Sequence, residues 1–246
     1  MNYIALDQYS KEHIIGISDL SGIDGIIVGD LYCNKRMFEY GEHELIDIVR
    51  KAREYDLMCI YQTPRYLTER NFSREMQLIL YLYKENLIQK VIVQDIGAAS
   101  YICKKCYGLS IVWGYMGISR NGAENLLGYS FLKEHGITEI ETDKVSYIPY
   151  LLELGFEIML MKEHIKYKTV NRECYYMYEN EIYDGNCNRE CLTKKYSLIN
   201  NKCGFDFSVD GYMLGKQYKP LELQEISTCV YNDTVTRAVS LSEYLI

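Results

Sequence analysis

Short apolar runs alternate with amphipathic stretches along the chain from residue 3 to residue 161. Short runs of this kind are typical of buried strands, and the stretches between them have the apolar spacing of helices. Strands are predicted at residues 3–6, 24–30, 57–63, 90–95, 109–115, 138–141 and 156–161. Helices are predicted at about 42–55, from a cap at Asn71 or Ser73 to about 85, and at 100–106, 121–136 and 145–154. The pattern therefore predicts repeated βα units.

The number of these units favours one large α/β fold. Seven βα-like units precede Lys162, and a parallel sheet with helical crossovers follows from such alternation. The count suits a TIM-like (β/α) barrel, whose closure the alternation alone does not show, and a doubly wound open sheet is the rival. We expect a single domain over residues 1–246, with βα repeats in 1–163 and a cysteine-rich appendage and C-terminal segment in 164–246.

Composition and charge narrow the class of protein. Apolar residues make up 48% and charged residues 25% of the chain, as in ordinary soluble proteins. The longest apolar stretches fall far short of the ~20 residues that span a bilayer, and MNYIALDQYS lacks the basic start of a signal peptide. We therefore expect a cytoplasmic protein without a membrane span. A net charge of −7 argues against a nucleic-acid partner, because phosphate binding needs a basic surface.

Nine cysteines are many for a chain in a reducing compartment, and an odd number does not fit a closed disulfide framework. Cys174, Cys187 and Cys191 form a C-x12-C-x3-C pattern, with turn residues at 184–186. If a helix follows, Cys187 and Cys191 share one of its faces. Three thiolates are one short of a closed site, and spacing alone does not separate an iron–sulfur cluster from zinc.

Cys33 is the best candidate for the fourth ligand. It lies just beyond the strand predicted at 24–30, where parallel sheets of this class place functional loops. Cys103 and Cys106 offer a second C-x2-C possibility, but they fall in a predicted crossover helix. The other cysteines lack a spacing partner: Cys59, which we expect to be buried in a strand, and Cys203 and Cys229, for which burial and ligation stay open.

The segment from Gly29 to Arg36, GDLYCNKR, resembles the G-E/D-x-x-C-S/N-K-R segment of UbiV-type iron–sulfur proteins. These belong to the collagenase-like, U32-type peptidase superfamily and have the same C-x12-C-x3-C trio. The resemblance runs from about residue 3 to about residue 215. It implies that a 4Fe–4S cluster is bound by Cys33, Cys174, Cys187 and Cys191.

The resemblance extends to two further places. Asp95-Ile96-Gly97 resembles the family's D-x-G, and Glu141 matches its glutamate after the next-but-one strand. Glu141 is followed by Thr142-Asp143, where the family usually has Leu-Ser. The implied activity is that of a cluster-bearing subunit of an oxygen-independent hydroxylase acting on a small aromatic or biosynthetic intermediate. A UbiU-like second subunit and prephenate as oxygen donor are implied with it.

The catalytic residue is not identified by sequence, but candidates can be named. Lys35 and Arg36 lie beside Cys33 and can face an anionic substrate, stabilise a cluster's charge, or form a loop salt bridge. The other candidates are Asp95, Glu141 and His164.

Three alternatives remain beside the hydroxylase. The first is a non-catalytic binding or assembly protein whose four cysteines hold a structural zinc. The second is an RNA-modifying hydroxylase of the same superfamily, against which the acidic charge counts. Peptidase activity is the least supported, because the sequence has neither a G-x-S-x-G nor an H-E-x-x-H motif.

Overall fold

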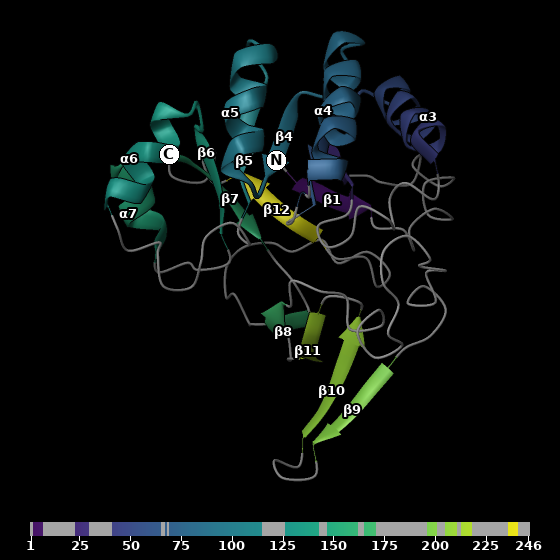
Figure 1. Ribbon diagram of the computed structural model, residues 1–246, viewed down its shortest axis with the longest axis vertical. Coiled ribbons are helices and arrows are strands. Elements are labelled where there is room, and N and C mark those ends of the chain that lie inside the picture. The colour runs from purple at the N-terminus through teal and green to yellow at the C-terminus, as the bar shows by residue number, and fades with distance from the viewer. Residues whose placement is uncertain are drawn as a thin grey trace. The chain divides into compact units, whose positions relative to one another are not determined.

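The computed structural model describes residues 2–6, 23–29, 41–64, 67, 69–114, 126–142, 147–161, 165–170, 196–200, 205–210, 213–217 and 236–240 (Figure 1). The chain divides into two compact units. One comprises Met1–Lys162 together with Cys229–Ile246, and the other is Glu163–Thr228.

The first unit contains a closed barrel of eight described strands. The strands are β1 (Asn2–Leu6), β2 (Gly25–Val28), β3 (Met58–Gln62), β4 (Lys90–Val93), β5 (Ser110–Trp113), β6 (Glu139–Thr142), β7 (Glu157–Met161) and β12 (Thr236–Ser240). Their order around the ring is β1-β12-β7-β6-β5-β4-β3-β2. Strands β1 to β7 are parallel, whereas β12 is antiparallel to both β1 and β7 (Figure 1). The prediction of a TIM-like barrel is confirmed, and ring closure excludes the open doubly wound sheet.

Closure of the barrel depends on the C-terminal strand. The sequence predicted that residues 164–246 form a cysteine-rich appendage and C-terminal segment outside the βα repeats, but β12 lies in the barrel sheet. The physical reason is that β1 and β7 would each leave an edge of unpaired backbone N–H and C=O groups. Strand β12 pairs with both edges, at Tyr3↔Ala238 and Leu160↔Val239 among others.

Helices connect most of the parallel strands. They are α3 (Gly41–Glu54), α4 (Glu69–Lys84), α5 (Ile96–Lys105), α6 (Leu126–Glu134) and α7 (Ile148–Glu153). Helix α4 begins at Glu69, so Asn71 and Ser73 lie inside it and the predicted cap there is wrong. An acidic residue in the first turn interacts favourably with the helix dipole, which is one reason for the earlier start. No described helix is long and apolar enough to cross a membrane.

Helix α5 also begins earlier than predicted, at Ile96 rather than near residue 100. Its N-cap is Asp95, whose carboxylate accepts a hydrogen bond of 2.9 Å from the backbone N–H of Ala98. This contact satisfies one of the N–H groups that lack a partner within a helix's first turn. The cap therefore fixes the start of α5 directly after β4.

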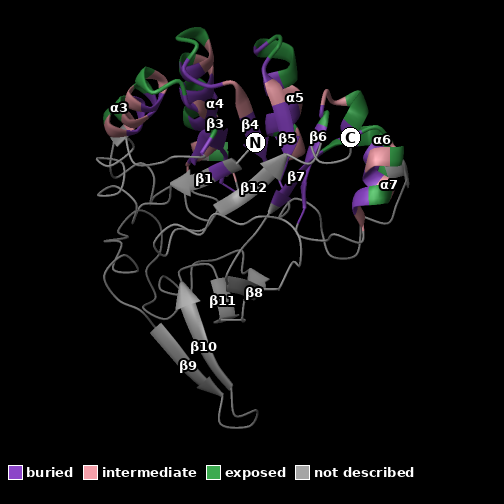
Figure 2. Cartoon of the chain, turned by 180° about the vertical axis from the view of Figure 1, so that it is seen from behind, coloured by how far each residue is buried: buried purple, intermediate pink, exposed green. Residues whose placement is uncertain are grey.

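Side chains alternate between the barrel interior and the surrounding helices. One set forms a single buried cluster drawn from strands around the ring: Tyr3, Ile27, Ile60, Ile92, Val112 and Met159. The intervening residues contact helices instead: the Cys59 thiol points to the backbone oxygen of Val49 in α3, at 3.8 Å, and Tyr61 contacts α4. Buried residues accordingly run along β3 to β7 in Figure 2, while exposed residues gather on the helices. Strand parity thus identifies which side chains face the barrel interior.

The second unit contains an antiparallel sheet. Its strands are β8 (Ile165–Val170), β9 (Tyr196–Asn200), β10 (Phe205–Asp210) and β11 (Met213–Gln217), in the order β8-β11-β10-β9. The sequence pattern predicted no continuation of the βα repeat after Glu163, and the described strands here, which pair antiparallel, agree with that expectation.

Candidate functional site

Three polar side chains lie on the interior face of the barrel at the C-terminal ends of its strands. Gln62 and Gln94 each follow a member of the buried cluster by two positions, and Glu141 pairs with another member across β6 and β7. Gln62 and Glu141 are fully buried, and Gln94 is 7% exposed. In α/β barrels this end carries the loops that build active sites, whereas the opposite end serves stability. These three residues are called the interior polar residues below.

The amide of Gln94 lies against the backbone of Gly114, which directly follows β5. The Gly114 N–H donates to the Val93 carbonyl at 2.8 Å, so the two strand ends are held together. A Cβ built on Gly114 would lie 1.8 Å from Gln94 Nε2 and 2.7 Å from its Oε1. Glycine at position 114 is therefore what leaves room for this amide. Neither Nε2 nor Oε1 of Gln94 has a hydrogen-bond partner within the described part of the chain.

The backbone conformation at position 29 explains why the GDLYCNKR segment begins with glycine. It follows β2 with φ +115°, a conformation that residues with a side chain rarely adopt. A Cβ there would also lie 2.2 Å from the backbone oxygen of Gln62. The ends of β2 and β3 therefore approach each other closely, and glycine is the residue that fits both this close approach and this backbone conformation.

The opposite end of the barrel interior holds a buried ion pair. Lys90 Nζ lies 2.5 Å from Glu139 Oε2, and the Glu139 side chain is 1% exposed. Burial raises the pKa of Glu139, while the charge and hydrogen bond of Lys90 oppose this rise. Because both residues lie at the N-terminal ends of their strands, we interpret the pair as structural.

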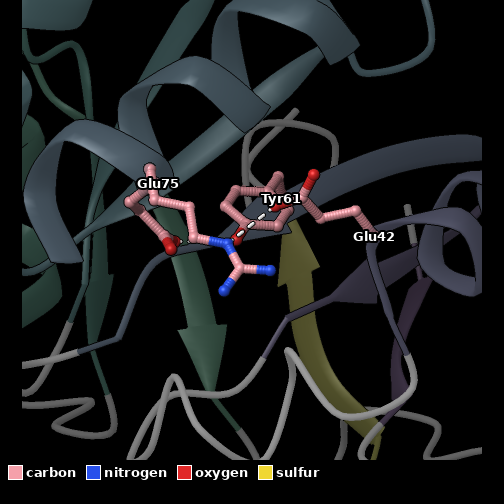
Figure 3. Close-up of polar contacts among 4 residues, drawn as sticks. Glu42, Tyr61 and Glu75 are labelled. Atoms are coloured by element: carbon pink, nitrogen blue, oxygen red, sulfur yellow. Dashed lines mark hydrogen bonds and ion pairs between the residues drawn. The ribbon is translucent and has the colours of Figure 1, made fainter.

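A second buried acid lies between β3 and α4 (Figure 3). The Tyr61 hydroxyl donates a hydrogen bond of 2.7 Å to Glu75 Oε1, and both side chains are fully buried. Glu75 Oε2 has no hydrogen-bond partner among the described residues. Burial raises the Glu75 pKa to about 7, against the lowering effects of Tyr61 and Arg74 and with a smaller rise from Glu42. Arg74 itself binds Glu42 of α3, with Nε 2.8 Å from Oε1.

Two of the predicted catalytic candidates are described by the structure. Asp95 caps α5, as shown above, and its carboxylate therefore has a structural role. Glu141 is buried in β6 and faces the barrel interior beside the other interior polar residues. The remaining candidates, Lys35, Arg36 and His164, lie outside the described residues.

The proposed cluster ligands Cys33, Cys174, Cys187 and Cys191 also lie outside the described residues, as do Cys203 and Cys229, so the ligand assignment stays a prediction. Cys59 is buried in β3 as expected, and burial raises its pKa to about 12. Cys103 is exposed, whereas Cys106 at the end of α5 is buried. Within the described ranges, no three His, Cys, Asp or Glu side chains are grouped to hold a metal ion.

The sequence pattern alone did not single out Gln62, Gln94 or the pair Tyr61–Glu75. A signal for the two glutamines was present, because each stands two positions after an isoleucine of the buried cluster, Ile60 for Gln62 and Ile92 for Gln94. No comparable signal was present for Glu75. Its environment depends on how α4 packs against β3, and helix periodicity does not reveal a contact with a particular tyrosine.

No protein-family model matches the chain, and no curated protein matches it. Among solved structures, a U32 peptidase is similar, with 17% identity, a TM-score of 0.43, and coverage of 63% of this chain and 65% of that chain. A Schiff-base-forming fructose-1,6-bisphosphate aldolase is similar as well, with 16% identity, a TM-score of 0.40, and coverage of 59% and 62%. The matches span less than two thirds of either known chain. At these scores, neither likeness assigns an activity to this chain.

Proposed function

We propose that this chain is a 4Fe–4S cluster-binding subunit of an oxygen-independent hydroxylase acting on a small aromatic or biosynthetic intermediate. The observation that carries the proposal is the group of interior polar residues at the C-terminal end of the barrel. An apolar interior with a small number of placed polar groups is typical of small-molecule sites, and this end is where α/β barrels build them.

The cysteine pattern supports the cluster. Strand β2 ends at Val28, at the C-terminal end of the barrel, and Cys33 follows five positions later in the sequence. Four thiolates are the usual donor set of a 4Fe–4S cluster, and the GDLYCNKR segment resembles that of UbiV-type proteins. When bound, such a cluster supplies one-electron transfer. A structural zinc uses the same donors and is the alternative occupant.

The chain's own residues would position and shield the small molecule. The amides of Gln62 and Gln94 can orient a polar group by hydrogen bonds, and Glu141 can accept a hydrogen bond or a proton. Lys35 and Arg36 are candidates for binding an anionic group such as a carboxylate of prephenate. A UbiU-like second subunit is the proposed partner, with His164 as a further candidate for the reaction itself.

Metal analysis of anaerobically purified protein tests the proposal. Iron, sulfide and zinc are measured in the wild type, in Cys33→Ala and in Cys103→Ala, an exposed cysteine of α5 that serves as the matched control. We expect about four irons and four sulfides per chain in the wild type and control, lost in Cys33→Ala. One zinc without sulfide would support the structural zinc instead, and neither metal would contradict both. Salt-sensitive RNA binding would be required to support the RNA-modifying alternative.

A further inference from the structure

Gln94 differs from its neighbours at the C-terminal end of the barrel in two respects: neither polar atom of its amide has a partner among the described residues, and its side chain is slightly exposed. It is 7% exposed, whereas Gln62 and Glu141 are fully buried. A primary amide has a carbonyl oxygen that accepts and an NH₂ group that donates hydrogen bonds. Both functions of Gln94 lack a partner among the described residues. Leaving such a buried group unsatisfied destabilises the folded protein, so its retention calls for a physical reason.

The register of the sheet shows what surrounds this amide. The interior pair one step below is Ile92 and Val112, so Gln94 and Gly114 come next, directly after the ends of β4 and β5. The same register continued to β6 brings Glu141 to this level. Three adjacent strands therefore present an amide, a glycine without a side chain, and a carboxyl group. The Gln94 amide occupies the space next to the Cα of Gly114, on the side of β4 that faces β5 and β6.

Other buried polar groups do not offer a comparable arrangement. Glu75 lies on the helix side of β3, where Tyr61 already donates to it. Lys90 and Glu139 are paired with each other at the opposite end of the barrel. Gln94 alone combines an interior position, an unpartnered amide and the functional end of the fold among the described residues.

We propose that Gln94 selects the small molecule bound at this end of the barrel, and that it takes a neutral group that both donates and accepts hydrogen bonds, such as a carboxamide or a hydroxyl. A carboxylate accepts a hydrogen bond from the NH₂ group, but it has no donor for the amide oxygen. An ammonium group satisfies the oxygen but sets donors against the NH₂. Only a group of mixed character satisfies both, which makes Gln94 a specificity-determining residue. The inference rests on the proposed function only in that a small molecule binds here.

Three probes that share one aromatic ring test this selectivity: benzamide, benzoate and benzylammonium. Each is titrated against the full chain by ligand-observed NMR, in the wild type, Gln94→Leu and Gln94→Glu. We expect the wild type to bind benzamide about tenfold more tightly than either ion, the ratio expected for one mismatched buried group. Gln94→Leu should remove this preference, and Gln94→Glu should shift it to benzylammonium, because a carboxylate only accepts.

Gln89→Leu is the matched control, since Gln89 Nε2 also lacks a described partner but lies before β4, at the opposite end of that strand. It should keep the wild-type preference. Equal binding of the three probes by the wild type, binding of none of them, or an unchanged preference in Gln94→Leu would each overturn the proposal. The wild-type ranking does not depend on any variant being folded. Iron content measured on the same samples separates this outcome from the cluster: a full cluster without the benzamide preference refutes the role of Gln94 alone.

Discussion

The buried acid Glu75 makes the stability of the barrel depend on pH in a defined direction. Its pKa rises from an ordinary value of 4.5 to about 7 in the folded protein, chiefly because of burial. The folded chain therefore holds this proton more tightly than the unfolded chain does. The resulting stabilisation is complete below pH 4.5 and is lost as the pH rises through about 7. At ~1.36 kcal/mol per pH unit, the interval corresponds to roughly 3 kcal/mol.

Glu75→Gln isolates this contribution, because glutamine stays neutral and keeps an acceptor for the Tyr61 hydroxyl. Urea unfolding of the wild type and the variant at pH values from 5 to 8 gives the free energy of unfolding of each. We expect the free energy of unfolding of the variant to rise relative to that of the wild type as the pH rises, by roughly 2–3 kcal/mol between pH 5 and pH 8. Glu69→Gln, an exposed acid of the same helix, is the control and should follow the wild type. If the free energies of unfolding of Glu75→Gln and the wild type changed with pH in parallel, the reasoning would be refuted.

Three further changes test the contacts that shape the two ends of the barrel. Asp95→Ala should lower the free energy of unfolding by about 1 kcal/mol, measured by thermal melting, because the N-cap of α5 is lost. Asp95→Asn keeps a capping oxygen and should retain the stability, so an equal loss in both variants would contradict the capping role. Lys90→Met should lower the free energy of unfolding, measured with urea, by roughly 3–5 kcal/mol, because Glu139 is left buried and unpaired. Adding Glu139→Leu should recover most of this loss. A Lys90→Met variant as stable as the wild type would refute the role of the ion pair. Gly114→Ala should lower the free energy of unfolding by about 1–3 kcal/mol, because the new methyl group displaces the Gln94 amide. If Gly114→Ala caused the same loss in a Gln94→Ala background, another contact would be responsible.

The chain's local patterns by themselves determined most of the elements. Short apolar runs predicted the parallel strands within one or two residues, because a strand buried on both faces needs apolar side chains on both. The helix after residue 41 followed from its apolar spacing. The helix predicted at 121–136 contains α6, and Gly136, just beyond Glu134, has a φ of +79°, a left-handed conformation typical of helix ends. The cysteine spacing, the resemblance it supports and the ligand set remain predictions from sequence.

Only the tertiary structure decided how the ring closes and which polar groups share an end of it. Strand β12 lies 75 residues beyond the end of β7, at 236 against 161, and no local pattern announces that it pairs with both β1 and β7. Likewise, Gln94 meets Gly114 because two strands align in register, and Glu75 meets Tyr61 because α4 packs on β3. Local propensity acts over a few residues, whereas these contacts join positions that only the closed barrel brings together.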